Sequence, residues 1–125
     1  GFILSVHEGP QSFRWRSTDG RRITLEEGMV ISNEPGYYEA GKFGIRHENL
    51  VLVRTGETTD YGQFMYLEPL TMAPFDRDAI DVSLLTEAEL AQLNSYHRLV
   101  YDTVAPLLPA EEQAWLAAAA APLHR

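Results

Sequence analysis

The hydrophobic pattern of this chain changes near residues 60–75, and this change constrains the fold more than any other feature. Before it, apolar residues alternate with polar ones or form short runs bounded by Gly and Pro, a pattern typical of strands. After it, apolar residues recur every three or four positions, as they do on one face of a helix. A run of strands followed by a run of helices predicts a fold of the α+β class.

The expected strands are short and separated by turn signals. The segment 43–53 has the clearest strand composition, and its apolar run from Leu50 to Val53 indicates a central, buried position. We expect strands over residues 2–7, 28–34, 43–53 and 64–70, with breaks or turns at Gly9–Pro10, Ser17–Gly20, Pro35–Gly36 and Thr55–Thr58.

The second half carries clear helix-start and helix-stop signals. Thr86 and Glu89 have the spacing of a capping box, in which each side chain bonds the backbone N–H of the other residue. Apolar residues at helical spacing follow until Pro106. Pro109 suits the start of a second helix, which Pro122 would end.

Composition excludes several classes of protein. Of the 125 residues, 45% are hydrophobic and 22% are charged, which is an ordinary globular balance. The net charge of −8 argues against a nucleic-acid or anionic-membrane partner. The absence of cysteine excludes disulfides, zinc-thiolate sites and cysteine nucleophiles. No signal peptide or membrane-length apolar run is present, and an apolar start at Gly1 suggests a fragment.

Two glutamates stand out because of where the expected strands place them. Glu34 ends an apolar strand just before Pro35–Gly36, and Glu48 shares a face with Arg46 on the next strand. Carboxylates from neighbouring strands can share hard divalent cations such as Mn²⁺ or Mg²⁺. Two alternatives stay open. Glu34 could be a solvated strand-end side chain, and Arg46 could form a cross-strand ion pair with a carboxylate.

Histidines and tyrosines supply the other candidates. His7, at the end of the first expected strand, could hold a substrate carbonyl, move a proton near neutral pH, or be structural. Tyr37 and Tyr38 follow a bend and could pack beneath a loop, or orient an arginine or a substrate. We assign a structural role to His47, which is expected on the face opposite the carboxylates, and no part in the chemistry to His97, which has apolar helical neighbours.

These motifs, in this order, resemble the metallopeptidases of the pita-bread fold, in particular the Xaa-Pro aminopeptidases. The resemblance implies that residues 1–60 are the C-terminal part of the catalytic domain, built on an antiparallel sheet. It implies that residues 61–125 are the last strand and a helical extension. The matching stretches are Val6–Pro10, Gly28–Val30, Ser32–Tyr38, Phe43–Arg46, Glu48–Leu50, Glu68–Thr71, Pro74–Ile80, Leu84–Thr86 and Leu93–His97.

The resemblance also implies an activity and roles for particular residues. Such an enzyme releases an N-terminal residue that precedes proline and uses two divalent metal ions, most often Mn²⁺. Glu34 and Glu48 match metal ligands, and Glu34 also matches the proton shuttle. His7 matches a histidine that contacts the substrate near its carbonyl, while Arg46 and Tyr38 match positions that orient the site and the substrate. A cytoplasmic homodimer, joined through the tail after residue 61, is implied as well.

The match leaves part of the expected site outside this chain. Two aspartates and one histidine, the other metal ligands of the family, would precede Gly1. We therefore expect a C-terminal fragment that is inactive by itself. The alternatives are a prolidase or creatinase-like hydrolase of the same fold, a metal-free pita-bread module that binds peptides or proteins, and a tail with a purely structural role.

Overall fold

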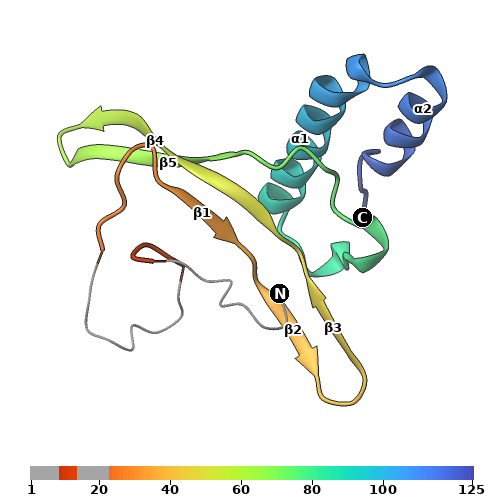
Figure 1. Cartoon of the computed structure of the whole chain (residues 1–125), viewed down its shortest axis with the longest axis horizontal. Coiled ribbons are helices and arrows are strands. Elements are labelled where there is room, and N and C mark those ends of the chain that lie inside the picture. The colour runs from red at the N-terminus through yellow and green to blue at the C-terminus, as the bar shows by residue number, and fades with distance from the viewer. Residues whose placement is uncertain (1–8, 14–22) are drawn as a thin grey trace. The chain divides into compact units, whose positions relative to one another are not determined.

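The computed structural model describes residues 9–13 and 23–125. The chain forms two compact units, Gly1–Thr71 and Met72–Arg125. Every strand of the described residues belongs to the first unit and both α-helices belong to the second (Figure 1), which confirms the α+β class. His7, the strand expected over residues 2–7 and the turn expected at Ser17–Gly20 lie outside the described residues. The division expected at residue 60 concerned family regions and stays a prediction.

The first unit contains two antiparallel sheets. One has three strands in the order β1-β4-β5, and the other is the hairpin β2-β3. In Figure 1 the chain passes from β1 directly into β2 and from β3 directly into β4. The strands are β1 (Val30–Asn33), β2 (Gly36–Glu39), β3 (Phe43–Arg46), β4 (Asn49–Thr59) and β5 (Gly62–Pro69).

Strand β4 is the centre of the larger sheet and supplies most of its core. Val51 and Val53 are buried on one face of β4, and Ile31 of β1, which pairs with Val51, is buried with them. Leu25 and Met29 pack against this cluster. The central, buried position expected for Leu50–Val53 is thus confirmed for the two residues whose side chains share the inner face.

One turn prediction in this unit was wrong and one was confirmed. The expected stop at Pro35–Gly36 is confirmed, since β1 ends at Asn33, although a strand that was not expected, β2, begins at Gly36 and includes Tyr37 and Tyr38. Thr55–Thr58 lies inside β4, where the register with β5 shifts between Thr55 and Thr58. This shift is a bulge, and it uses the same small and polar residues that elsewhere make turns. The actual turn follows Thr59 and precedes Gly62, whose φ of 119° favours glycine.

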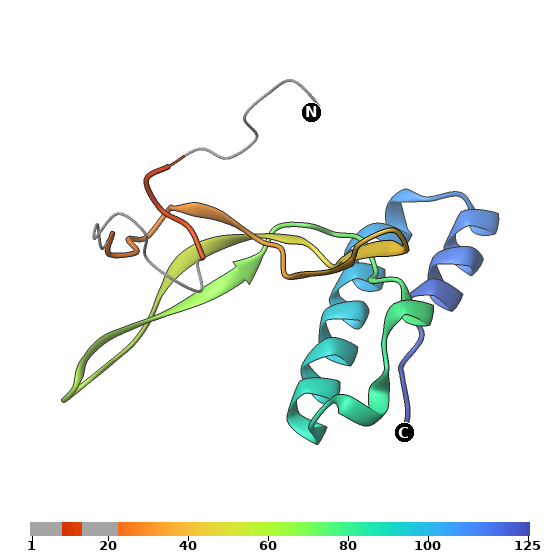
Figure 2. The same cartoon turned by 90° about the horizontal axis from the view of Figure 1, so that it is seen from below.

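The second unit is built on two α-helices and three short 3₁₀ turns (Figure 2). The capping box is confirmed. The Glu89 N–H donates to Thr86 Oγ1 at 3.2 Å, and the Thr86 N–H donates to Glu89 Oε2 at 2.7 Å. The elements are η1 (Arg77–Ala79), η2 (Val82–Leu84), α1 (Glu87–Val104), η3 (Ala105–Leu107) and α2 (Ala110–Ala119).

Prolines set the limits of these helices largely as expected. Pro106 lies in η3, directly after α1, where its missing N–H does no harm. Pro109 is the N-cap of α2. The helices join through a buried cluster of Val100 from α1, Ala105 from η3 and Leu116 from α2.

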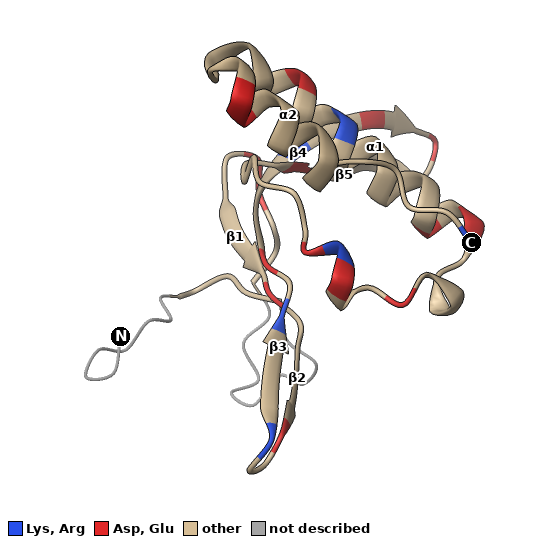
Figure 3. Cartoon of the chain, turned by 90° about the vertical axis from the view of Figure 1, so that its right-hand side faces the viewer, with Lys and Arg blue, Asp and Glu red and all other residues tan. Residues whose placement is uncertain are grey.

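The distribution of charged residues and the hydropathy of the helices fit the expectations from the composition. Acidic residues occur in both units and outnumber basic ones (Figure 3), as the totals of 18 and 10 require. Neither helix in the described ranges combines the length and the apolar character that a bilayer crossing needs.

His97 is the one buried polar side chain of the described residues, and it lies in the helical unit. It is fully buried on α1, and its Nε2 accepts a hydrogen bond from the Phe75 N–H at 3.2 Å. Burial, helped by the positive charge of Arg77, lowers the pKa of His97 below its usual value of 6.5. The folded chain therefore binds fewer protons than the unfolded chain around that pH.

This burial predicts a pH-dependent stability. As the pH falls through about 6.5, the unfolded histidine takes up a proton that buried His97 resists, so the free energy of unfolding should decrease. His97→Gln keeps an acceptor for the Phe75 N–H but does not titrate. The free energy of unfolding of this variant should therefore decrease less than that of the wild type as the pH falls. Denaturant unfolding of the chain from about pH 8 to about pH 5.5 measures the difference. His124→Gln, at an exposed position, is the control and should match the wild type.

Candidate functional site

The two candidate carboxylates, Glu34 and Glu48, lie where the larger sheet passes into the hairpin. Asn33 of β1 pairs with Asn49 of β4, and Gly36 of β2 pairs with Arg46 of β3. The register is the same on both sides of the break, so position 34 stands opposite position 48. Directly opposite residues of an antiparallel pair put their side chains on the same face, with Cβ atoms about 5 Å apart. The alignment of Glu34 with Glu48 is thus a consequence of strand register.

Proline explains why the ladder is interrupted at this point. Pro35 stands opposite His47 in the same register and has no N–H to donate. The predicted strand over 43–53 is accordingly divided into β3 and β4 at His47 and Glu48. Both carboxylates lie in this gap between the two sheets, where the backbone is not fully engaged in ladder hydrogen bonds.

Glu34 is held by two side chains. Its Oε1 accepts a hydrogen bond from Ser32 Oγ at 2.7 Å, and its Oε2 forms an ion pair with Arg46 Nη1. Only 24% of the Glu34 side chain is exposed, so the alternative of a freely solvated strand-end glutamate was wrong. The other alternative, a cross-strand ion pair between Arg46 and a carboxylate, is confirmed with Glu34 as the partner.

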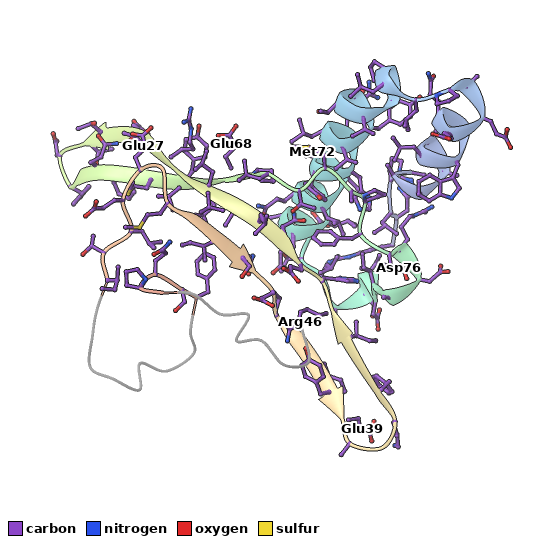
Figure 4. All side chains as sticks on the ribbon, in the orientation of Figure 1. Glu27, Glu39, Arg46, Glu68, Met72 and Asp76 are labelled. Atoms are coloured by element: carbon purple, nitrogen blue, oxygen red, sulfur yellow. The ribbon has the colours of Figure 1, made fainter. Side chains whose placement is uncertain are left out.

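Tyr38 holds Arg46 from the other side. Arg46 Nε donates to Tyr38 Oη at 2.8 Å, and the guanidinium carbon lies 5.7 Å from the centre of the Tyr38 ring. The bond to Tyr38, more than any other contact, raises the pKa of Arg46. In Figure 4 the labelled Arg46 lies beside the passage from β1 to β2. Arg46 therefore stays charged and connects the phenol to the carboxylate of Glu34.

Tyr37, Glu48 and His47 lie next to the cluster of Glu34, Arg46 and Tyr38 along the strands. Tyr37 alternates with Tyr38 along β2 and contacts Phe43, with ring centroids 6.0 Å apart. Tyr37 therefore does not join the cluster. Glu48 is exposed, and no hydrogen bond or ion pair within the described residues engages it. His47 is half-buried, in line with the structural role expected of it.

The sequence reasoning missed one member of this cluster and could have found it. Ser32 shares a face with Glu34 at a spacing of two residues, and a hydroxyl there can reach the carboxylate. Within residues 9–13 and 23–125, no group of three or more His, Asp or Glu side chains is arranged to hold a metal ion. The contacts of the described residues thus join Glu34, Arg46, Tyr38 and Ser32, and the strand register puts Glu48 opposite Glu34.

Comparison with known protein families shows which family the chain belongs to. Residues 1–55 match metallopeptidase family M24, and residues 63–123 match the C-terminal region of peptidase M24. The chain belongs to metallopeptidase family M24. The matches are consecutive and cover both units, which confirms the resemblance found in the sequence. Glu34, Arg46 and Glu48 all lie in the part that matches the peptidase family itself.

Individual relatives of this M24 chain are named as aminopeptidases P. Aminopeptidase P2 of Arabidopsis thaliana is 49% identical over 120 residues, covering 93% of this chain and 17% of the relative. A probable Xaa-Pro aminopeptidase P of Laccaria bicolor is 44% identical over 128 residues, covering 98% of this chain and 20% of the relative. The chain thus spans no more than about a fifth of the length of these relatives.

A solved structure shows the same fold. The crystal structure of an X-prolyl aminopeptidase from Caenorhabditis elegans, described as a cytosolic enzyme with a di-nuclear active site, superposes with a TM-score of 0.73 at 33% identity. The match covers 79% of this chain and 17% of that chain. The antiparallel sheet with a helical extension is therefore an arrangement found in an X-prolyl aminopeptidase.

Proposed function

We propose that this chain is the C-terminal part of a metal-dependent Xaa-Pro aminopeptidase, which releases an N-terminal residue that precedes proline. The observation that carries the proposal is the strand register that sets Glu34 opposite Glu48, with Arg46 bound to Glu34. The similarity to relatives named as aminopeptidases P supports the substrate class.

The carboxylates of Glu34 and Glu48, which flank the hairpin, fit part of a site for two divalent ions. Two carboxylates on one face are hard oxygen ligands of the kind that Mn²⁺ and Mg²⁺ prefer. Both oxygens of Glu34 already accept a contact, but each carboxylate oxygen has a second lone pair for a metal ion. The remaining ligands would come from outside the described residues.

The chain's own residues would hold and orient the reacting groups. Bound metal ions would lower the pKa of a water molecule and polarise the scissile carbonyl. Glu34 would take the proton from the attacking water, because a carboxylate held at a fixed position can act as a general base. Arg46 would keep Glu34 ionised and in place, and Tyr38 would hold the arginine. His7 is proposed to contact the substrate near its carbonyl.

The test is a peptidase assay with the full-length protein that contains this chain. We expect hydrolysis of an Xaa-Pro-Xaa tripeptide, none of a matched Xaa-Ala-Xaa tripeptide, loss of activity after chelation, and recovery with Mn²⁺. Preference for an Xaa-Pro dipeptide would favour a prolidase. Binding of the peptide without hydrolysis or metal uptake would favour a metal-free recognition module. In the same assay the 125-residue chain by itself should be inactive.

Three finer points complete the proposal. We propose Mn²⁺ as the metal, since oxygen-rich sites suit it. A cytoplasmic location is supported by the description of the Caenorhabditis elegans enzyme as cytosolic. A homodimer joined through the second unit is supported by the exposed apolar side chain of Trp115, of which 66% is accessible. Light scattering of the full-length protein distinguishes a dimer from a monomer.

A further inference from the structure

Two glycines of the hairpin leave the space in which the Tyr38 ring lies. Gly44 pairs with Tyr38, and Gly36 precedes it by two residues, so all three positions face the same side. A Cβ added at Gly36 would lie 2.7 Å from Tyr38 Oη and 2.8 Å from Cε2. A Cβ added at Gly44 would lie 2.6 Å from Tyr38 Cδ1 and 2.9 Å from Cε1. The ring therefore occupies the volume that two side chains would otherwise fill.

The backbone does not need glycine at either position. Among the described residues, positive φ values occur at Gly28, Gly41 and Gly62, and at neither Gly36 nor Gly44. An alanine could adopt the backbone conformation of both positions, and glycine inside a strand costs stability relative to alanine. What excludes a side chain at these two positions is the Tyr38 ring.

The position of the ring determines what Arg46 can reach. Lying along the hairpin, Tyr38 brings its Oη to 2.8 Å from Arg46 Nε, while Nη1 of the same guanidinium contacts Glu34. Two contacts to one rigid planar group fix its orientation. The Arg46 side chain is 42% exposed, and a long exposed side chain does not otherwise hold one geometry.

We propose that Gly36 and Gly44 are positioning residues: together they seat the Tyr38 ring so that its hydroxyl fixes Arg46 against Glu34. The role assigned to Glu34 in this inference rests on the proposed function. The seating of the ring itself does not, because it follows from the contacts of the hairpin.

The seating can be tested without metal or substrate. In the full-length apo-protein, 3-fluorotyrosine at position 38 gives one ¹⁹F resonance that reports the surroundings of the ring. Gly44→Ala should shift this resonance, because the ring must leave the hairpin surface. Gly36→Ala should do the same and serves if Gly44→Ala does not fold. Gly41→Ala is the control. It strains a turn with φ of 74° but has no heavy atom within 4 Å of the added Cβ, so the resonance should stay.

The role of the glycines is tested by metal affinity and turnover. Gly44→Ala should weaken Mn²⁺ binding or lower kcat about 10- to 100-fold, the usual effect of disturbing groups that orient a metal ligand. In a Tyr38→Ala background there is no ring to displace, so Gly44→Ala should have almost no further effect. Equal losses from Gly44→Ala in both backgrounds would overturn the proposal.

The two tests separate this inference from the proposed function. A wild-type protein that binds no Mn²⁺ and cleaves no Xaa-Pro peptide refutes the function, yet the seating stands if Gly44→Ala moves the ¹⁹F resonance and Gly41→Ala does not. An active wild type whose resonance is unchanged by Gly44→Ala and Gly36→Ala keeps the function and refutes the seating.

Discussion

Glu34→Gln in the full-length protein should lower kcat by about 10²- to 10⁴-fold, the range associated with loss of a general acid–base group. The amide cannot take a proton from water, and it removes the negative charge that pairs with Arg46. Glu48→Gln should also lower Mn²⁺ content, since a neutral amide is a poorer ligand for a hard cation. Steady-state kinetics on an Xaa-Pro-Xaa peptide, together with metal analysis, measure both effects.

The matched control for these substitutions lies at the other end of the same hairpin. Glu39 pairs with Lys42 at 2.6 Å at the tip of β2-β3 (Figure 4), far along the strands from the break that holds Glu34. Glu39→Gln removes the same charge from an ion-paired carboxylate and should leave kcat and metal content unchanged, because this ion pair lies at the tip of the hairpin and surface ion pairs contribute little. Wild-type kinetics for both Glu34→Gln and Glu48→Gln would remove these residues from the site.

Leu116→Ala should have the largest effect on stability, lowering the free energy of unfolding by about 2–5 kcal/mol. Leu116 is 3% exposed and packs with Val100 and Ala105, where α2 meets α1 and η3. Truncation leaves a cavity that the surrounding helices fill only in part. Denaturant unfolding followed by circular dichroism, which reports mainly the helical unit, measures the loss.

A second leucine in the same unit separates burial from residue type. Leu107 lies in η3 and is 81% exposed, so Leu107→Ala removes the same atoms from a position that contributes little packing. Its effect should stay within about 0.5 kcal/mol. Equal losses for Leu107→Ala and Leu116→Ala would show that the cluster around Val100 does not stabilise the chain.

Local signals in the sequence predicted the helical unit well. The capping box of Thr86 and Glu89, the stop at Pro106 and the helix start at Pro109 act through neighbouring backbone groups, so they need no distant partner. The strands were harder, since Thr55–Thr58 has turn composition but lies at a bulge, and the strand that follows Pro35 was not expected. Whether such residues turn the chain depends on the strand that pairs with them.

The candidate site shows the same division. Strand alternation placed Arg46 and Glu48 on one face and gave a reason to consider Glu34, but it left the partner of Arg46 open. The structure shows that the partner of Arg46 is Glu34. The register of the strand pairs on both sides of the break brings Glu34 close to Arg46, 12 positions further along the chain. Alternation within one strand says nothing about register between strands.

The sequence by itself determined the α+β class, the two helices with their caps, and the motifs that mark an M24 metallopeptidase. These depend on periodicity, on local hydrogen bonds and on the types of residues that chemistry requires. Only the tertiary structure decided that the registers on both sides of the break put position 34 opposite position 48, that Arg46 pairs with Glu34, and that Gly36 and Gly44 make room for the Tyr38 ring. Each of these follows from cross-strand register, which long-range packing fixes and no single segment contains.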